Sequence, residues 1–98
     1  MTSVPGGSIQ VGPASQLHID NIIDFNIAMA LETEGKHLDP ETVRGGVLAV
    51  FNRDDLGFYV IAECSGRPIG QLLITYEWSD WRNALFWWIQ SVYVRPEY

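Results

Sequence analysis

Three stretches rich in β-forming residues make up the second half of the chain, and only short connections separate them. Residues 58–63, 69–78 and 85–94 have strand-like composition, whereas residues 65–68 and 79–83 carry the Gly, Pro, Ser, Asp and Asn typical of turns. A parallel return to the same sheet needs a crossover of about a dozen residues or more, which these connections are too short to supply. The second half of the chain is therefore predicted to form a three-stranded antiparallel meander.

A short strand and a long amphipathic helix are predicted at the start of the chain. Residues 9–11 are a strand candidate, which Gly12 and Pro13 end. In the helix that follows, Ser15 is placed to cap the N-terminus, and Gly35 can end the helix in a left-handed turn. One apolar stripe recurs along this helix at three- and four-residue steps: Ile19, Ile22, Ile23, Ile27, Ala30 and Leu31.

A second helix is predicted before the meander, with a sharper start. Asp39, Pro40 and Glu41 supply an N-cap, a proline in the first turn and an acidic residue near the positive end of the helix dipole. Gly45 and Gly46 lie inside this helix, where each costs about 1 kcal/mol relative to alanine. They indicate either close packing or a kink. Its apolar face carries Val43, Val47, Val50 and Phe51.

These elements predict an α+β domain over residues 9–98, preceded by a flexible lead at residues 1–8. The length of 98 residues suits one domain, and 47% apolar with 18% charged residues is a globular composition. A net charge of −6 disfavours binding to nucleic acid or to an anionic membrane surface. Neither a signal segment nor an apolar run of about 20 residues is present. A cytoplasmic location is therefore expected.

Three phrases along the chain occur in a recognisable order. Residues 30–43 read ALETEGKHLDPETV, residues 61–70 carry Ile61, Ala62, Glu63, Gly66 and Gly70, and the last ten residues carry Val92, Val94, Pro96 and Tyr98. Together they resemble the N-terminal half of the GNAT superfamily of acetyl-CoA-dependent N-acetyltransferases. The resemblance implies that the two helices lie over the acceptor site. It also implies that residues 57–81 correspond to the family's second and third strands and that residues 89–98 end its fourth.

The resemblance also implies acetyl-CoA as the cofactor. In the family, the loop that holds the cofactor's pyrophosphate follows the counterpart of Tyr98 directly, and it uses the free N–H groups of a helix N-terminus. This sequence stops at Tyr98. We therefore expect a domain that lacks the pyrophosphate-binding half and has little or no activity alone.

The end of the last strand carries the residues that the resemblance assigns to catalysis. Acyl transfer to an amine needs orientation, a donor for the oxyanion and a route for the amine proton. The resemblance implies that unpaired backbone groups of Val92, Tyr93 and Val94 contact the pantetheine arm, with the Val92 N–H as oxyanion donor; an ordinary strand is the alternative. Glu77 is the nearest acidic candidate for a base, acting through water, and its alternative is a solvated glutamate at a strand end.

Several side chains are candidates for holding the acceptor, a small-molecule amine. Gln90 and Ser91 are neutral where some diamine-acetylating relatives have carboxylates, which argues against a polyamine. Glu32 and Glu34, near the end of the first helix, could hold an ammonium group, or they form a solvated helix end. His18 and His37 lack partners at metal-ligand spacing, so no metal site is expected.

Four tryptophans cluster in the second half of the chain. Trp78 and Trp81 flank a loop and either line an acceptor pocket, with cation–π contact to an amine, or belong to the core. Both faces of residues 85–94 are apolar, which predicts core positions for Trp87 and Trp88. Strict alternation places Leu85, Trp87, Ile89, Ser91 and Tyr93 on one face, and Phe86, Trp88, Gln90, Val92 and Val94 on the other.

The sequence is also compatible with a function other than catalysis. An apolar last strand with one unpaired edge is a template for another chain, so a homodimer paired through residues 85–94 is expected. The alternative to an enzyme is a non-catalytic α+β module that dimerises through this strand. A third interpretation, small-ligand binding in a tryptophan-lined cleft, has no motif behind it.

Overall fold

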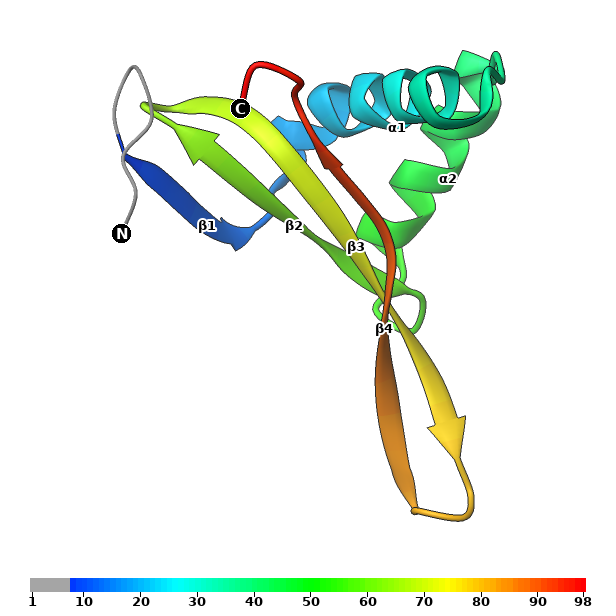
Figure 1. Cartoon of the computed structure of the whole chain (residues 1–98). Helices are drawn as coiled ribbons and strands as arrows, with labels where there is room; N and C mark the ends of the chain where they lie inside the picture. The colour runs from blue at the N-terminus through cyan, green and yellow to red at the C-terminus, as the bar shows by residue number, and fades with distance from the viewer. Residues whose placement is uncertain (1–7) are drawn as a thin grey trace.

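The computed structural model describes residues 8–98, and seven of the eight residues predicted as a flexible lead lie outside this range. The chain forms β1 (Ile9–Pro13), a 3₁₀ turn (Gln16–His18), α1 (Ile19–Glu34), α2 (Pro40–Asn52), β2 (Gly57–Cys64), β3 (Arg67–Ser79) and β4 (Ala84–Val94) (Figure 1). The sheet has the order β1-β2-β3-β4, and every neighbouring pair is antiparallel. The predicted α+β fold and its antiparallel meander are therefore confirmed.

The residues predicted to cap the helices do so at Gly35 and Asp39, but the cap at Ser15 belongs to a different element. Ser15 accepts a hydrogen bond from the Leu17 N–H, so it caps the 3₁₀ turn that leads into α1 rather than α1 itself. Gly35 ends α1 with a φ of 64°. At the start of α2, the Asp39 carboxylate accepts from the Thr42 hydroxyl and N–H, which lowers the Asp39 pKa.

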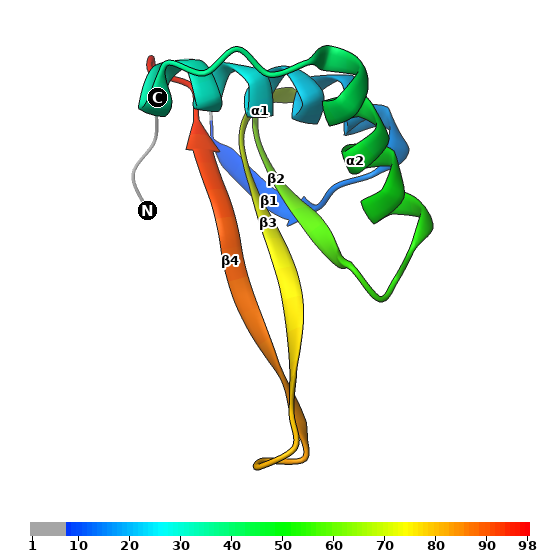
Figure 2. The same ribbon diagram turned by 90° about the vertical axis from the view of Figure 1, so that its right-hand side faces the viewer.

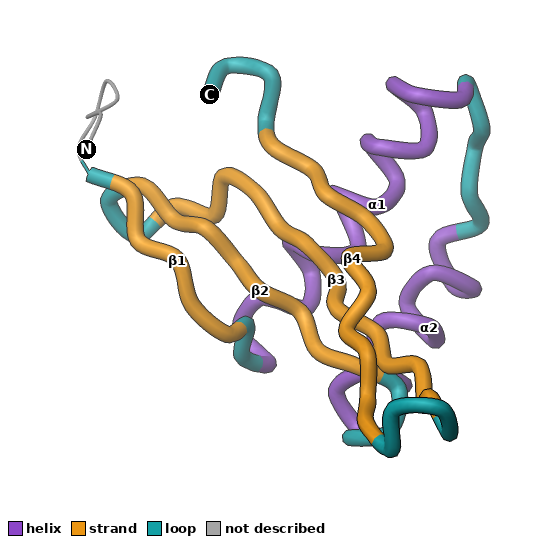
Figure 3. Tube along the Cα trace, turned by 60° about the horizontal axis from the view of Figure 1, so that its bottom comes forward, coloured by secondary structure: helices purple, strands orange, loops and turns teal. Residues whose placement is uncertain are grey.

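Both helices lie on the same side of the sheet (Figure 3), and the core forms between them and the strands. Ile22 of α1 and Val47 of α2 are the largest fully buried side chains. They pack with Tyr59 and Ile61, which point from β2 to the helix side. The apolar stripes predicted for the two helices thus face one shared core, except that Leu31 of the first stripe is 47% exposed.

The two helix glycines are not sites of close packing. A Cβ added to Gly45 or Gly46 would meet no atom within 4 Å, so the close-packing interpretation is wrong, and α2 runs on through both positions as one helix. Gly57 is different, because its φ of 150° disfavours other residues and a Cβ there would overlap the carbonyl of Ile74. Gly57 therefore lets β2 start close against β3.

A β-bulge in β4 corrects the predicted alternation of side chains. Leu73 lies opposite Ser91 and Ile74 lies opposite Ile89, so Gln90 is an extra residue on β4. Below the bulge, the Trp87 ring contacts Phe58 on the side away from the helices, with centroids 5.3 Å apart. Above it, Tyr93 contacts Phe25 of α1, with centroids 5.4 Å apart. Ser91 and Tyr93 therefore do not share a face with Trp87, because the extra residue reverses the alternation.

The far end of the β3–β4 hairpin projects from the rest of the molecule (Figures 1 and 2). Pairing between β2 and β3 ends at Gly57 and Thr75, so residues 76–87, here called the arm, form a ribbon of two strands only. Trp87 and Trp88 are 64% and 51% exposed, so the prediction that they lie in the core is wrong. They are exposed because no third strand or helix covers this part of the hairpin.

Candidate active site

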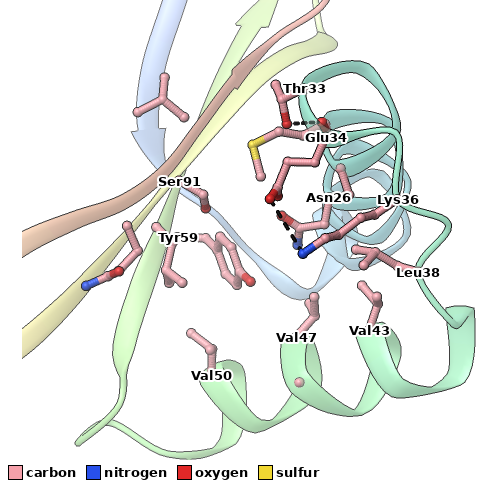
Figure 4. A pocket seen from close by; sticks show the side chains of 16 residues that line it. Asn26, Thr33, Glu34, Lys36, Leu38, Val43, Val47, Val50, Tyr59 and Ser91 are labelled. Atoms are coloured by element: carbon pink, nitrogen blue, oxygen red, sulfur yellow. Dashed lines mark hydrogen bonds and ion pairs between the residues drawn. The ribbon is translucent and has the colours of Figure 1, made fainter.

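A cavity of about 720 Å³ opens between α1, α2 and the sheet (Figure 4). This volume lies within the range of about 300–1,000 Å³ typical of small-molecule sites. The cavity combines walls from both helices with a floor from β2, β3 and β4. Its apolar lining consists of Met29, Ala30, Leu38, Val43, Val47, Val50 and Leu73.

The two charged residues that line the cavity, Glu34 and Lys36, form an ion pair. Glu34 is the single acidic residue among the lining residues, and its carboxylate lies 3.6 Å from the ammonium of Lys36 (Figure 4). Both side chains are more than half exposed, so the pair is solvated and contributes little to stability. The cavity therefore presents no unpaired carboxylate to a ligand.

Three polar side chains form a chain of contacts that starts in the core and reaches the cavity. The Gln71 Nε2 donates to the Asn26 Oδ1 at 2.9 Å, and Asn26 in turn hydrogen-bonds the Tyr59 hydroxyl. Gln71 and Tyr59 are only 5% and 6% exposed. Burial raises the Tyr59 pKa, and the hydrogen bond with Asn26 opposes that rise. Asn26 and Tyr59 both line the cavity.

The upper part of β4 offers free backbone groups along the edge of the sheet (Figure 2). The Arg95 N–H donates to the Ile69 carbonyl at 2.8 Å, which continues the ladder in which Tyr93 lies opposite Gln71. In an antiparallel ladder, residues bonded to the neighbouring strand alternate with residues that point away from it. Tyr93 therefore bonds to β3, whereas Val92 and Val94 direct their backbone N–H and C=O groups to the open edge.

Val92 also lies where the edge meets the cavity. It lines the large cavity together with Gln90 and Ser91, and it lines a smaller apolar cavity of about 170 Å³ together with Val60, Leu72 and Val94. The bulge at Gln90 sets this geometry, because the residues on either side of it turn the strand and its backbone groups relative to the arm. A predicted donor, Val92, thus borders the space where an acceptor would sit.

Glu77 and Gln90 are engaged with neighbouring side chains. The Trp88 Nε1 donates to the Glu77 carboxylate at 2.6 Å, and the Gln90 Nε2 donates to the Thr75 hydroxyl at 2.8 Å. Glu77 belongs to the exposed arm and does not line the cavity, whereas Gln90 does. The predicted base is therefore held outside the cavity by an indole.

The other predicted acceptor residues separate into two groups. Glu34 lines the cavity, but Glu32 accepts a hydrogen bond from the Tyr93 hydroxyl at 2.7 Å, which raises the Tyr93 pKa. Trp78 and Trp81 are 58% and 95% exposed on the arm, so they are not core residues and they do not line this cavity. Of the residues proposed to bind the acceptor, Glu34, Gln90 and Ser91 come together.

Sequence reasoning missed Asn26, Tyr59 and Gln71. A signal for Asn26 exists, because it lies three and four residues after Ile23 and Ile22 and interrupts the apolar stripe of α1. Gln71 has a similar signal, since it is a polar residue two positions before Leu73 on the inward side of β3. A polar side chain at a core position needs a buried partner, and these two residues are each other's partners.

Within residues 8–98, no group of three His, Cys, Asp or Glu side chains is placed to hold a metal ion. Neither α1 nor α2 has the length and hydropathy of a membrane-spanning helix. The single cysteine, Cys64, is buried.

Comparison with known proteins identifies the fold and one protein of similar sequence. No protein-family model and no curated protein matches the chain, but solved structures do. A possible acetyltransferase from Clostridium difficile 630 is 43% identical, with a TM-score of 0.88 over 92% of this chain. A GNAT family acetyltransferase from Staphylococcus aureus subsp. aureus USA300_TCH1516 superposes with a TM-score of 0.70 at 14% identity. The fold of this chain is that of part of a GNAT acetyltransferase, and its sequence is similar to that of a possible acetyltransferase.

The match covers only part of these GNAT structures. The chain spans 59% of the length of the Clostridium difficile structure and 64% of the Staphylococcus aureus structure. An aminoglycoside acetyltransferase from an uncultured soil metagenomic sample, in complex with sisomicin, matches with a TM-score of 0.63 at 11% identity, which shows a shared fold alone. The GNAT fold seen here is therefore a partial one.

Proposed function

We propose that this GNAT domain serves acetyl transfer from acetyl-CoA to a small-molecule amine. The observation that carries the proposal is the open edge at Val92 and Val94, which borders a cavity of about 720 Å³. A thioester-bearing arm laid along that edge would pair with the free backbone groups as an added strand does. Its acyl carbon would then face an amine held between the helices and the sheet.

Different residues of this chain would have different roles in such a reaction. Acetyl-CoA would supply the acetyl group as a thioester: the amine nitrogen bonds to the acyl carbon, the carbon–sulfur bond breaks, and the sulfur leaves as a thiolate that takes up one proton as the amine gives one up. The Val92 N–H is the proposed donor to the developing oxyanion, because it points to the open edge. The apolar walls would contact the apolar part of the amine. Glu77 is the proposed acceptor of the amine proton; because it lies on the arm outside the cavity and accepts from the Trp88 indole, the proton would have to reach it through intervening water.

The described residues suit the pantetheine arm but not the diphosphate. A pyrophosphate site needs a helix N-terminus with free N–H groups and no competing negative charge. The first turn of α1 carries Asp20, and the start of α2 carries the capping Asp39 and Glu41. We therefore expect this chain alone to bind acetyl-CoA no better than a ligand that lacks the nucleotide.

Titration of the labelled chain with S-acetylpantetheine and with acetyl-CoA, followed by amide NMR shifts, tests this proposal. We expect both ligands to shift the Val92 and Val94 amides with similar, weak affinities. Shifts that spare β4 would remove the basis for an acyl-transfer assignment. Micromolar binding of acetyl-CoA, with weak S-acetylpantetheine binding, would show a phosphate site that the present argument does not contain.

A second proposal, a homodimer formed through β4, is favoured by the exposure of the hairpin. Trp87, Ile89 and Val92 are each more than half exposed, beside backbone groups that have no partner among residues 8–98. Pairing two β4 strands would cover both features. Light scattering should then give a dimer mass, and a Val92→Pro variant should reduce it by removing an outward N–H. A monomer mass at high concentration would contradict the dimer.

A further inference from the structure

Two charged side chains of opposite sign enter the cavity from the end of α1. Glu34 is the last residue of α1, and Lys36 follows Gly35, whose left-handed φ of 64° turns the chain there. Figure 4 shows the charged ends of both side chains meeting among the lining residues. Glu34 also lies at the negative end of the helix dipole, which strengthens its attraction for a cation. The described lining therefore presents one anionic and one cationic group side by side.

These two groups are free to exchange partners. Their nearest nitrogen and oxygen atoms lie 3.6 Å apart, farther than the ~2.7–2.9 Å of a charge-assisted hydrogen bond. The side chains of Lys36 and Glu34 are 66% and 60% exposed, and a pair this solvated is only weakly held together. A ligand that offers each group a new partner can therefore separate the pair at small cost.

Most neutral polar side chains of the lining already have protein partners. The Thr33 hydroxyl donates to the Met29 carbonyl at 2.7 Å, and the Gln90 amide donates to a hydroxyl of β3 at 2.8 Å. Asn26 and Tyr59 are hydrogen-bonded to one another. Recognition of a charged ligand in this cavity therefore falls mainly to the ion pair.

The ion pair favours a ligand that carries both charges. An ammonium alone would take Glu34 and leave Lys36 with water, and a carboxylate alone would do the reverse, so each ligand forms one ion pair and breaks another. A ligand with both groups replaces one ion pair by two. In an α-amino acid, the nitrogen and the carboxyl carbon lie about 2.5 Å apart by standard bond lengths and angles, which suits two protein charges 3.6 Å apart.

We infer that the acceptor is an α-amino acid with an apolar side chain, held with its ammonium on Glu34 and its carboxylate on Lys36. This inference rests on the proposed function for the transfer of acetyl to the bound nitrogen. The side chain of the amino acid would contact the apolar walls of the cavity. Acetylation turns the ammonium into an uncharged amide, so the product loses its contact with Glu34 and binds more weakly than the substrate.

Calorimetric or NMR titration of the 98-residue chain with four aromatic probes tests the inference. The probes are L-phenylalanine, phenethylamine, which lacks the carboxylate, hydrocinnamate, which lacks the amine, and N-acetyl-L-phenylalanine, whose nitrogen is uncharged. We expect L-phenylalanine to bind about fivefold more tightly than each of the other three, which is the gain from one further ion pair at a solvated site.

Substitution of each charged residue should remove the preference for the amino acid. Lys36→Gln should lower the affinity for L-phenylalanine to that for phenethylamine or below, without weakening phenethylamine. Glu34→Gln should lower it to that for hydrocinnamate or below. Both side chains are more than half exposed, so neither variant should disturb the fold.

The ion pair between Arg44 and Asp20 supplies the matched control, because its charged atoms lie 3.3 Å apart, its side chains are 47% and 82% exposed, and neither residue lines the cavity. Arg44→Gln and Asp20→Asn should change none of the four affinities.

Three results would each overturn the inference: equal binding of L-phenylalanine and phenethylamine, equal weakening of all four probes by Lys36→Gln, or no binding of L-phenylalanine. Failure of the proposed function is separate, because L-phenylalanine would then bind as expected while S-acetylpantetheine leaves the Val92 and Val94 amides unmoved.

Discussion

Substitutions of the adjacent glycines Gly45 and Gly46 in α2 can test stability and ligand binding independently of each other. Gly45 and Gly46 lie in the middle of a helix of 13 residues, and both are solvent-exposed. An added Cβ at either position meets no atom within 4 Å, so alanine has no steric cost. Alanine also removes the backbone entropy that glycine loses in a helix, which is worth about 1 kcal/mol per position. Gly45→Ala and Gly46→Ala should therefore each stabilise the fold by about 1 kcal/mol.

Urea unfolding followed by circular dichroism measures this gain. For a chain of this size the slope of unfolding free energy against urea is about 1–3 kcal/mol/M, so each variant should raise the midpoint by about 0.5 M. Thermal unfolding should show a rise of about 4–8 °C. A lower midpoint for either alanine variant would refute the reasoning, because it would mean that the glycine is needed for packing or for a bend.

The same two positions differ in what lies beside them. Gly46 lines the cavity between the helices and the sheet, whereas Gly45 does not. Leucine has nearly the helix propensity of alanine, so Gly45→Leu and Gly46→Leu should both remain folded. Only Gly46→Leu should weaken the binding of a small-molecule amine such as phenethylamine, because the leucine side chain would occupy the cavity. Equal weakening by both variants would show that the amine binds elsewhere.

Three further predictions concern the core, the start of β2 and a hydrogen bond at the end of β4. Gly57→Ala should destabilise the fold by more than about 1–3 kcal/mol, since it combines a disfavoured φ of 150° with overlap on the Ile74 carbonyl; a urea midpoint equal to that of the wild type would contradict this. Ile22→Ala should cost about 2–5 kcal/mol, because Ile22 is fully buried, and a loss below about 1 kcal/mol would show a site that collapses freely. The native chain should hold the Tyr93 proton above pH 10, where an unfolded chain has released it, because the bond to Glu32 raises the Tyr93 pKa. The stability from this bond is thus complete below about pH 10 and is lost as the pH rises further. Glu32→Gln should bring the tyrosinate absorbance of Tyr93 to lower pH, and an unchanged titration would show that the bond does not form in solution.

Much of the fold could be read from short-range chemistry. Asp39 and Gly35 mark helix ends because a capping carboxylate and a left-handed turn depend only on neighbouring residues. The antiparallel meander followed from the length of two connections. These features were predictable because each is determined within a few residues along the chain.

The candidate site was only partly predictable. Gln90, Ser91 and Val92 were identified through the family resemblance, and they line the cavity. The bulge at Gln90 was not foreseen, because a bulge depends on how β4 pairs with β3 rather than on the composition of β4. Trp87 and Trp88 were placed in the core because apolar composition predicts burial, yet burial requires elements that cover the side chain, and both tryptophans stay more than half exposed at and beside the arm.

By itself, the sequence determined the order and type of the elements, the end of α1 at Gly35, the start of α2 at Asp39 and the antiparallel pairing of the last three strands. Only the tertiary structure decided which side chains share the cavity, since Asn26, Tyr59 and Gln71 lie far apart along the chain and meet through the packing of α1 on the sheet. It also decided the open edge at Val92. The physical reason is that caps and turns are set by local backbone geometry, whereas hydrogen-bond direction, burial and register are set by partners that the chain acquires only on folding.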